Sequence, residues 1–294
     1  MTTLPILVGY DGSAGADAAL DWALDEATRS GAPVELVYAL QLPTVPGPIA
    51  PRPTYWPDPA ARPAAENMLA AAVSRVAETR PEAIVRATVA DGSPGEVLRE
   101  RSREAGILVL GHRGTGGFTE LLLGSTPVTV SAHAHCPVVV IRPGTPAADR
   151  PGHVLVGVDG SPGSVLALGF AFEQAAARGL GLRAVRGWAM PVAVWQLPAL
   201  DLSDVAEEQR RSLEELVAGW REKYPSVPVE TALLTESPGP ALVAASRDAA
   251  LAVVGSRGHG GFTGLLLGSV SQQLLHHGRC PVAVVRERQS GEPA

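Results

Sequence analysis

The chain has 294 residues, 46% of them hydrophobic but only 4% aromatic, so its cores must be built mainly from Ala, Val and Leu. A formal net charge of −6 without any basic stripe argues against a nucleic-acid partner. No apolar run approaches the ~18 residues of a membrane-spanning helix, the N-terminus lacks the layout of a signal peptide, and two cysteines make no disulfide framework. We therefore expect a cytoplasmic protein with neither nucleic acid nor a membrane as partner.

Two stretches recur at an almost constant distance along the chain. Leu7–Ser13 matches Leu155–Ser161, and Gly111–Ser125 matches Gly255–Ser269. A period near 146 residues is too long for a solenoid repeat and indicates a duplicated domain. We therefore predict two similar domains at 1–143 and 152–288, joined by a linker at 144–151 that has the composition of a loop.

Strand and helix patterns alternate through the first half. Ser13 is the predicted N-cap of a helix that Gly31 ends, and Ser93-Pro-Gly-Glu96 is a capping box. Eight prolines from Pro43 to Pro63 predict a long loop without regular structure. In chain order we expect strand 6–9, helix 13–30, strand 34–40, helix 64–80, strand 84–90, helix 94–105, strand 107–110, a helix through 133 and strand 137–142.

The second half repeats this order, with strands beginning near residues 154, 182, 229, 251 and 282. Ser161-Pro and Ser237-Pro are again predicted to be N-caps, and 202–223 is the longest predicted helix. Alternating strands and helices form parallel sheets with right-handed crossovers. We therefore predict an α/β protein of two tandem doubly wound domains, each a five-stranded parallel sheet of order 3-2-1-4-5 with helices on both faces.

Both glycine-rich stretches read Gly-x2-Gly-x9-Gly-Ser, and each follows a short aliphatic run. The pattern predicts a strand, a loop and the start of a helix, whose backbone N–H groups can hold a phosphate. Arginine or histidine inside the loops can add positive charge, whereas the chain's single lysine, Lys223, excludes a P-loop lysine. The alternative interpretation is a flexible turn that binds nothing.

An aspartate follows the first strand of each half, at Asp11 and Asp159. In the order 3-2-1-4-5, strands one and four are neighbours, so each aspartate faces the glycine loop of its own half at the point where such sheets bind ligands. There it can accept a hydrogen bond from a ribose hydroxyl or a base amine. The alternative is that each aspartate only stabilises the turn after the strand.

These motifs make the chain similar to tandem-domain universal stress proteins of the ATP-binding subgroup, and the resemblance covers nearly all of both halves. It implies ATP in each half, often with Mg²⁺, and a role in surviving stress or growth arrest. It also implies pairing through the last strands, 138–142 with 282–286, and allows a homodimer. Carried over by position, the ATP-binding residues are Gly9, Asp11, Ala39, Gly111, Arg113, Gly114, Thr115, Gly116, Gly117, Gly124 and Ser125, then Gly157, Asp159, Gly187, Gly255, Arg257, Gly258, His259, Gly260, Gly261, Gly268, Ser269 and Val270.

The two halves differ after the last glycine-serine of the motif. Val270 follows in the second half, as in the family, but Thr126-Pro127 follows in the first and removes one backbone N–H. No evident base could activate water, and no residue is predicted to be catalytic or to ligate a metal. Regulatory nucleotide binding is therefore favoured, and a slow ATPase or phosphoryl-transfer enzyme using the same sites is the alternative.

One cysteine near the end of each half, Cys136 and Cys280, lies close to histidines. A metal site or a redox pair of thiols is one interpretation. The other is a small buried residue that enters the last strand, with histidines at the end of the preceding helix. One cysteine per half without a Cys-x2-Cys motif favours the buried residue.

Overall fold

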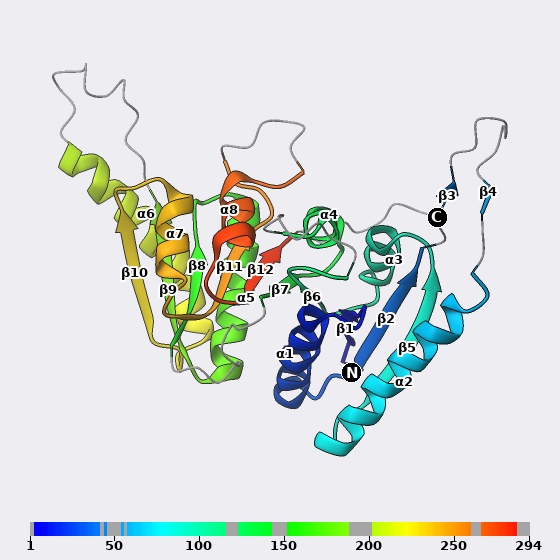
Figure 1. Cartoon of the computed structure of the whole chain (residues 1–294). Coiled ribbons are helices and arrows are strands. Elements are labelled where there is room, and N and C mark those ends of the chain that lie inside the picture. Colours follow the sequence, from blue (N-terminus) through cyan, green and yellow to red (C-terminus); the bar gives the residue numbers. More distant parts are fainter. Residues whose placement is uncertain are drawn as a thin grey trace. The chain divides into compact units, whose positions relative to one another are not determined.

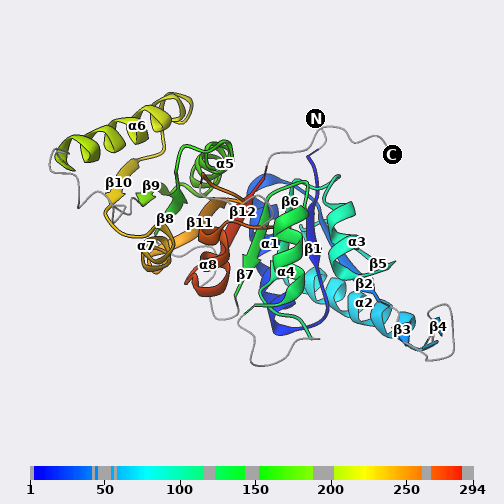
Figure 2. The same ribbon diagram turned by 90° about the horizontal axis from the view of Figure 1, so that it is seen from above.

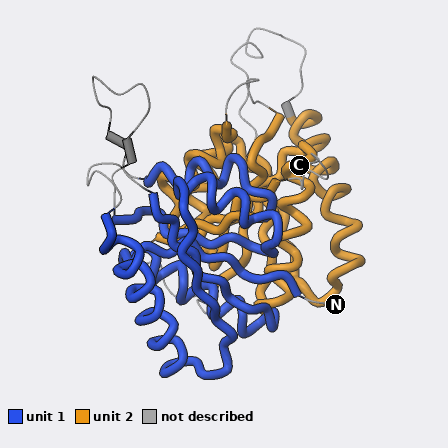
Figure 3. Tube along the Cα trace, turned by 90° about the vertical axis from the view of Figure 1, so that its right-hand side faces the viewer, with its two compact units in different colours: residues 1–136 blue, residues 137–294 orange. Residues whose placement is uncertain are grey.

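The computed structural model describes residues 3–41, 44–45, 54–55, 58–115, 123–142, 152–187, 202–259 and 266–286. Contacts between residues divide the chain into unit 1, residues 1–136, and unit 2, residues 137–294 (Figure 3). The predicted linker at 144–151 lies outside the described residues, as does residue 143. Among the helices described, none combines the length and the apolar character needed to cross a membrane.

Unit 1 is a parallel sheet with helices packed against it (Figure 1). The strands lie in the order β5-β2-β1-β6, which are the first four positions of the predicted order. Its elements are β1 (Ile6–Gly9), α1 (Ala14–Ser30), β2 (Val34–Leu40), β3 (Thr44–Val45), β4 (Thr54–Tyr55), α2 (Ala61–Thr79), β5 (Val85–Asp91), α3 (Pro94–Arg101), β6 (Ile107–Gly111) and α4 (Ser125–His133).

The predicted helix ends of unit 1 are confirmed at α1. The Ser13 Oγ accepts a hydrogen bond from the Ala16 N–H at 3.1 Å, and Gly31 ends the helix in the left-handed conformation at φ 69°. Helix α3, by contrast, ends at Arg101 rather than near residue 105. The Ser102 hydroxyl donates to the Arg99 carbonyl at 2.5 Å, and such side-chain bonds compete with the helical ladder.

The proline-dense stretch contains more regular structure than the sequence suggested. Within its described part, β3 and β4 pair antiparallel, with Thr44 opposite Tyr55. The prediction of a loop without any regular element was therefore wrong at these four residues. Helix α2 also begins three residues before the predicted start, which places Pro63 in its first turn, where a missing N–H breaks no helical bond.

Unit 2 holds a complete copy of the predicted sheet. Its strands lie in the order β10-β9-β8-β11-β12-β7, and the first five, all parallel, reproduce 3-2-1-4-5. Helices α5 and α6 cover one face and α7 and α8 the other (Figure 2). The elements are β7 (Val138–Ile141), β8 (His153–Gly157), α5 (Pro162–Arg178), β9 (Gly181–Gly187), α6 (Leu202–Lys223), β10 (Val229–Leu234), α7 (Pro238–Ala245), β11 (Ala249–Gly255), α8 (Ser269–His277) and β12 (Val282–Val285).

The last strands of the two halves pair as expected. Strands β7 and β12 run antiparallel, with Val138 opposite Val284 and Val140 opposite Val282. All four residues of each strand are buried. Because these side chains are β-branched or aliphatic, the pair adds a continuous apolar layer to the core of unit 2.

An aromatic cluster joins α5 to α6. The ring of Trp220 stacks on Phe172, with 6.0 Å between ring centroids, and lies 6.3 Å from the ring of Tyr224. It also covers Gly169, where a Cβ would lie 2.6 Å from the indole ring. Trp220 therefore packs between α5 and α6, and glycine at 169 lets the two helices approach this closely.

Candidate functional site

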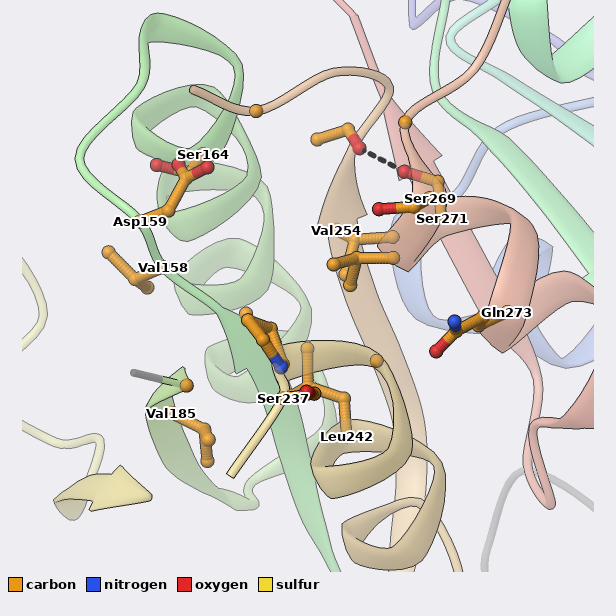
Figure 4. Close-up of a pocket in the computed structure, with 18 of the residues that line it drawn as sticks. Val158, Asp159, Ser164, Val185, Ser237, Leu242, Val254, Ser269, Ser271 and Gln273 are labelled. Atoms are coloured by element: carbon orange, nitrogen blue, oxygen red, sulfur yellow. Dashed lines mark hydrogen bonds between the residues drawn. The ribbon is translucent and has the colours of Figure 1, made fainter. Parts of the chain in front are cut away.

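A pocket of about 540 Å³ opens in unit 2 at the carboxyl ends of β8, β9 and β11. Its volume lies within the range of small-molecule sites, ~300–1,000 Å³. Figure 4 shows Asp159 on one side of the pocket, Ser269, Ser271 and Gln273 of α8 on the other, and Val254 between them. Nine of the predicted residues line it: Gly157, Asp159, Gly187, Gly255, Arg257, Gly258, Gly268, Ser269 and Val270.

Asp159 is held rigidly in the turn that follows β8. One carboxylate oxygen accepts from the Ser161 N–H at 2.9 Å and the Ser161 hydroxyl at 2.6 Å, and the other accepts from the His259 N–H at 3.0 Å. Burial by itself raises the pKa of Asp159, but these hydrogen bonds and one from Ser164 outweigh it and lower the pKa below its ordinary value. The residue is therefore a carboxylate at neutral pH.

The glycine loop fits tightly around this carboxylate. A Cβ on Gly258 would lie 2.2 Å from the Asp159 Oδ2, so any other residue would displace the aspartate or the loop. His259 contributes its backbone N–H to Asp159 and does not line the pocket. Gly260 and Gly261 lie outside the described residues.

The start of α8 forms the opposite wall. Its N-cap is Gly268, which offers no side-chain acceptor to the first-turn N–H groups. The Gly268 N–H donates to the Ser256 carbonyl at 2.8 Å, and the Ser271 hydroxyl donates to the Gly255 carbonyl at 2.7 Å (Figure 4). The wall is therefore fixed to the end of β11 while the helix N-terminus stays available to an anion.

The sequence did not identify the third wall, which comes from α7 and from the second turn of α8. Ser237, Gly239 and Leu242 line the pocket from α7, and Gln273 lines it from α8. Ser237 is the N-cap residue of α7, as predicted, but its hydroxyl makes no capping hydrogen bond. The sequence did contain one indication of this wall, because Ser-Pro-Gly occurs at residues 93–95 and again at 237–239.

Unit 1 builds the same turn around Asp11. This carboxylate accepts from the Ser13 N–H at 3.1 Å and the Thr115 N–H at 2.7 Å, and a Cβ on Gly114 would lie 2.3 Å from its Oδ2. The backbone carbonyl of Arg113 accepts from the Ser13 hydroxyl at 3.4 Å. The first loop thus folds around Asp11 as the second folds around Asp159.

The remaining residues predicted for the first site take the places that their repeat partners occupy. Gly9 and Gly111 end β1 and β6, Ala39 lies at the end of β2 opposite Ala90 of β5, and Gly124-Ser125 starts α4. Gly116 and Gly117 lie outside the described residues.

Three substitutions distinguish unit 1 from unit 2 at positions that match the lining of the unit 2 pocket. Leu110 stands where the second half has Val254, and its Cδ2 lies 2.5 Å from the position of a Cβ on Gly9, whereas the nearest Val254 methyl lies 3.2 Å from the matching position on Gly157. Pro127 replaces Ser271 and so loses the hydroxyl that fixes the helix start. Glu96 replaces Pro240 and adds a negative charge.

The two cysteines are buried, with 1% of Cys136 and 3% of Cys280 exposed. Within the part of the chain that the structure describes, no three His, Cys, Asp or Glu side chains come together as a metal site.

Comparison with known proteins agrees with this architecture. The family model described as "Universal stress protein family" matches residues 3–142 and 151–286. A universal stress protein of Mycobacterium tuberculosis is 39% identical over 287 residues, covering 96% of this chain and 97% of that protein. One from Mycolicibacterium smegmatis is 36% identical over 302 residues, covering 98% of each chain.

Solved structures show the same fold. The crystal structure of a universal stress protein from Archaeoglobus fulgidus aligns with a TM-score of 0.66 at 19% identity and covers 98% of this chain and 100% of that one. A second, from Pseudomonas aeruginosa, aligns with a TM-score of 0.61 at 16% identity and covers 96% and 93%. The matched regions and the relatives over nearly the whole length show that the chain belongs to the universal stress protein family, with two copies of its domain in tandem.

Proposed function

We propose that this protein binds ATP in the pocket of unit 2 and that nucleotide occupancy regulates its activity in the stress response. The observation that carries the proposal is the convergence of Asp159, the glycine loop and the start of α8 on one pocket of about 540 Å³. A carboxylate, an uncapped helix N-terminus and apolar walls are the three surfaces that a nucleotide needs for its ribose, phosphates and base.

Each part of ATP has a matching surface. Val158, Val185 and Leu242 supply apolar walls for the adenine ring. The Asp159 carboxylate accepts from a ribose hydroxyl, as acidic residues do at other switch-point sites. The start of α8 and the Arg257 guanidinium receive the phosphates, since both carry positive charge.

The donor set limits how Mg²⁺ can bind. Asp159 is the only carboxylate among the described residues that line the pocket, and three N–H or O–H donors already occupy its oxygens. Magnesium in nucleotide sites is commonly held by one or two carboxylates together with phosphate oxygens and water. We therefore expect Mg²⁺ to enter with the nucleotide and to be held chiefly by its phosphates.

Regulation is favoured over catalysis because the described lining residues include no histidine, glutamate or lysine that could activate water. The first half is proposed to hold a second, weaker site around Asp11. Leu110 in place of the smaller Val254, and the carboxylate of Glu96 in place of Pro240, would both disfavour a polyphosphate there. Occupancy of two unequal sites would let the protein respond over a wide range of nucleotide concentration.

The proposal is tested by measuring the adenine nucleotide that copurifies with the protein. The protein is denatured and the supernatant is chromatographed for adenine nucleotide, in wild type and in Gly258→Glu. We expect wild type to release ATP and the variant to release much less, because the new side chain collides with Asp159. Gly219→Glu is the matched control, since nothing lies within 4 Å of a Cβ at that position in α6. Equal release from all three proteins, or none together with no heat on ATP titration, contradicts the proposal.

A steady-state phosphate-release assay on the same proteins separates binding from turnover. We expect no release above background from wild type. Measurable release that Gly258→Glu abolishes and Gly219→Glu retains supports the slow ATPase instead.

A further inference from the structure

Two arginines stand at the carboxyl ends of neighbouring parallel strands in unit 2. Gly255 of β11 is paired with Val285 of β12, and the Ser256 N–H donates to the Val285 carbonyl at 2.9 Å. Arg257 comes two residues after Gly255, and Arg286 comes directly after Val285. Their backbones therefore leave the sheet side by side, at the edge where the pocket opens.

Arg257 belongs to the pocket and Arg286 lies beside it. Arg257 lines the cavity, and its Cα lies 3.5 Å from the position of a Cβ on Gly268, at the start of α8. Partial burial lowers the pKa of Arg286, and the positive charge of Arg257 lowers it further. Two guanidinium groups and a helix N-terminus thus bring positive charge to one place.

Acidic side chains do not neutralise this pair within the described residues. Neither Arg257 nor Arg286 makes an ion pair with a described aspartate or glutamate, although ten other arginines do so. Like charges held together at a partly buried position raise the free energy of the empty site and lower that of a site occupied by an anion.

The repeat partner of Arg286 shows a different use of the same residue type. Arg142 follows β7, and its Nη2 donates to the carbonyls of Leu275 at 3.2 Å and His276 at 2.7 Å. Those bonds tie Arg142 to the end of α8, where carbonyl groups attract a cation. No comparable bond holds Arg286 in the described structure, so its side chain is available to a ligand.

We propose that Arg286, together with Arg257, grips the terminal phosphate of the nucleotide and makes the second site selective for triphosphates. This inference rests on the proposed function. It adds that the site recognises the terminal phosphate and so distinguishes ATP from AMP. A guanidinium can donate two parallel hydrogen bonds to a phosphate, and two of them can hold the end of a polyphosphate chain. AMP, which lacks the two outer phosphates, does not reach this pair.

Calorimetric titrations with ATP and AMP test the inference. They are made on the full-length protein carrying Gly114→Glu. This substitution is meant to remove the proposed first site, so that the measured heat comes from binding at the second site. Arg286→Gln is expected to weaken ATP binding about tenfold or more and to change AMP binding less than about twofold. Arg279→Gln is the matched control, because Arg279 is exposed and precedes β12 at the opposite edge of the sheet. It should leave both affinities unchanged.

The outcomes separate this inference from the proposed function. If the parent protein binds neither ATP nor AMP, the proposed function fails. If it binds ATP and Arg286→Gln keeps the same ratio of ATP to AMP affinity, nucleotide binding stands and the phosphate clamp is wrong. Should Arg286→Gln fail to fold, Arg286→Lys decides: lysine cannot form the two-pronged contact, so a reduced ratio supports the clamp and an unchanged ratio overturns it.

Discussion

Asp159 and Asp11 are the residues that hold equivalent turns together in the two units. Each carboxylate is oriented by backbone N–H groups from two segments far apart in the sequence. At Asp159 these bonds lower the pKa of the carboxyl group and so stabilise its charged form. The aspartates therefore have a structural role within the turn and a proposed role in recognition, and mutations must separate the two.

Replacing Asp159 with alanine should weaken ATP binding at the second site by about tenfold, since a charge-assisted hydrogen bond to the ribose is lost. Asp11→Ala is the matched variant in the other half and should leave the second site unchanged. Calorimetry gives the affinities, and circular dichroism with a thermal melt checks that both variants fold. A folded Asp159→Ala protein with wild-type affinity contradicts the role assigned to Asp159.

The lowered pKa of Asp159 also predicts how stability depends on pH. A group whose pKa is lower in the folded state contributes stability above its unfolded pKa of about 3.9, and that contribution disappears as pH falls through the folded value. The difference in unfolding free energy between wild type and Asp159→Ala should therefore be constant from about pH 7 to 5 and shrink below about pH 4. Denaturant titrations across this range measure it. A difference that already shrinks near pH 6 would mean a raised pKa.

At the scale of elements, the contact between α5 and α6 stabilises unit 2 beside the turn that holds Asp159, because α5 begins directly after that turn. The rings of Trp220, Phe172 and Tyr224 stack on one another. The indole ring fits against α5 because Gly169 has no side chain. The Lys223 ammonium lies 5.0 Å from the centre of the Trp220 ring, so a cation–π contact covers the outer side.

Trp220→Ala should lower the unfolding free energy of unit 2 by about 3 kcal/mol, because a large ring leaves a cavity over Gly169. Leu166→Ala in α5 is the control; Leu166 is 39% exposed, and its loss should change stability by less than about 0.5 kcal/mol. Guanidinium unfolding followed by circular dichroism compares them. Equal stability of the two variants would show that the aromatic cluster is not a main support of the α5–α6 contact.

At the scale of the whole molecule, much of the fold could be predicted from the sequence. Alternating strand and helix patterns gave the parallel order because crossover connections leave few topologies open. The repeat then assigned the same role to Asp11 and Asp159 and identified the glycine loops. Every described residue predicted for the second site, apart from His259, lines the pocket.

The missing parts depend on contacts that no local pattern encodes. Ser237, for which the repeated Ser-Pro-Gly was the one signal, lines the pocket from the start of α7. Gln273 lines it from one turn further along α8 than the motif extends. The β3–β4 pair joins two-residue segments about ten residues apart, too short for any periodicity to reveal. Leu110 in place of Val254 is a difference of one methylene group, which the glycine motif does not register.

Titration of ATP into wild type and Gly258→Glu by calorimetry tests most directly whether the pocket of unit 2 is a nucleotide site. We predict saturable heat in wild type from a tight site and a weaker one, and loss of the tight site alone in Gly258→Glu. The weaker site, which we assign to the first half, should remain in that variant and disappear in Gly114→Glu. No saturable heat in wild type, or the same tight site in Gly258→Glu, would contradict the account.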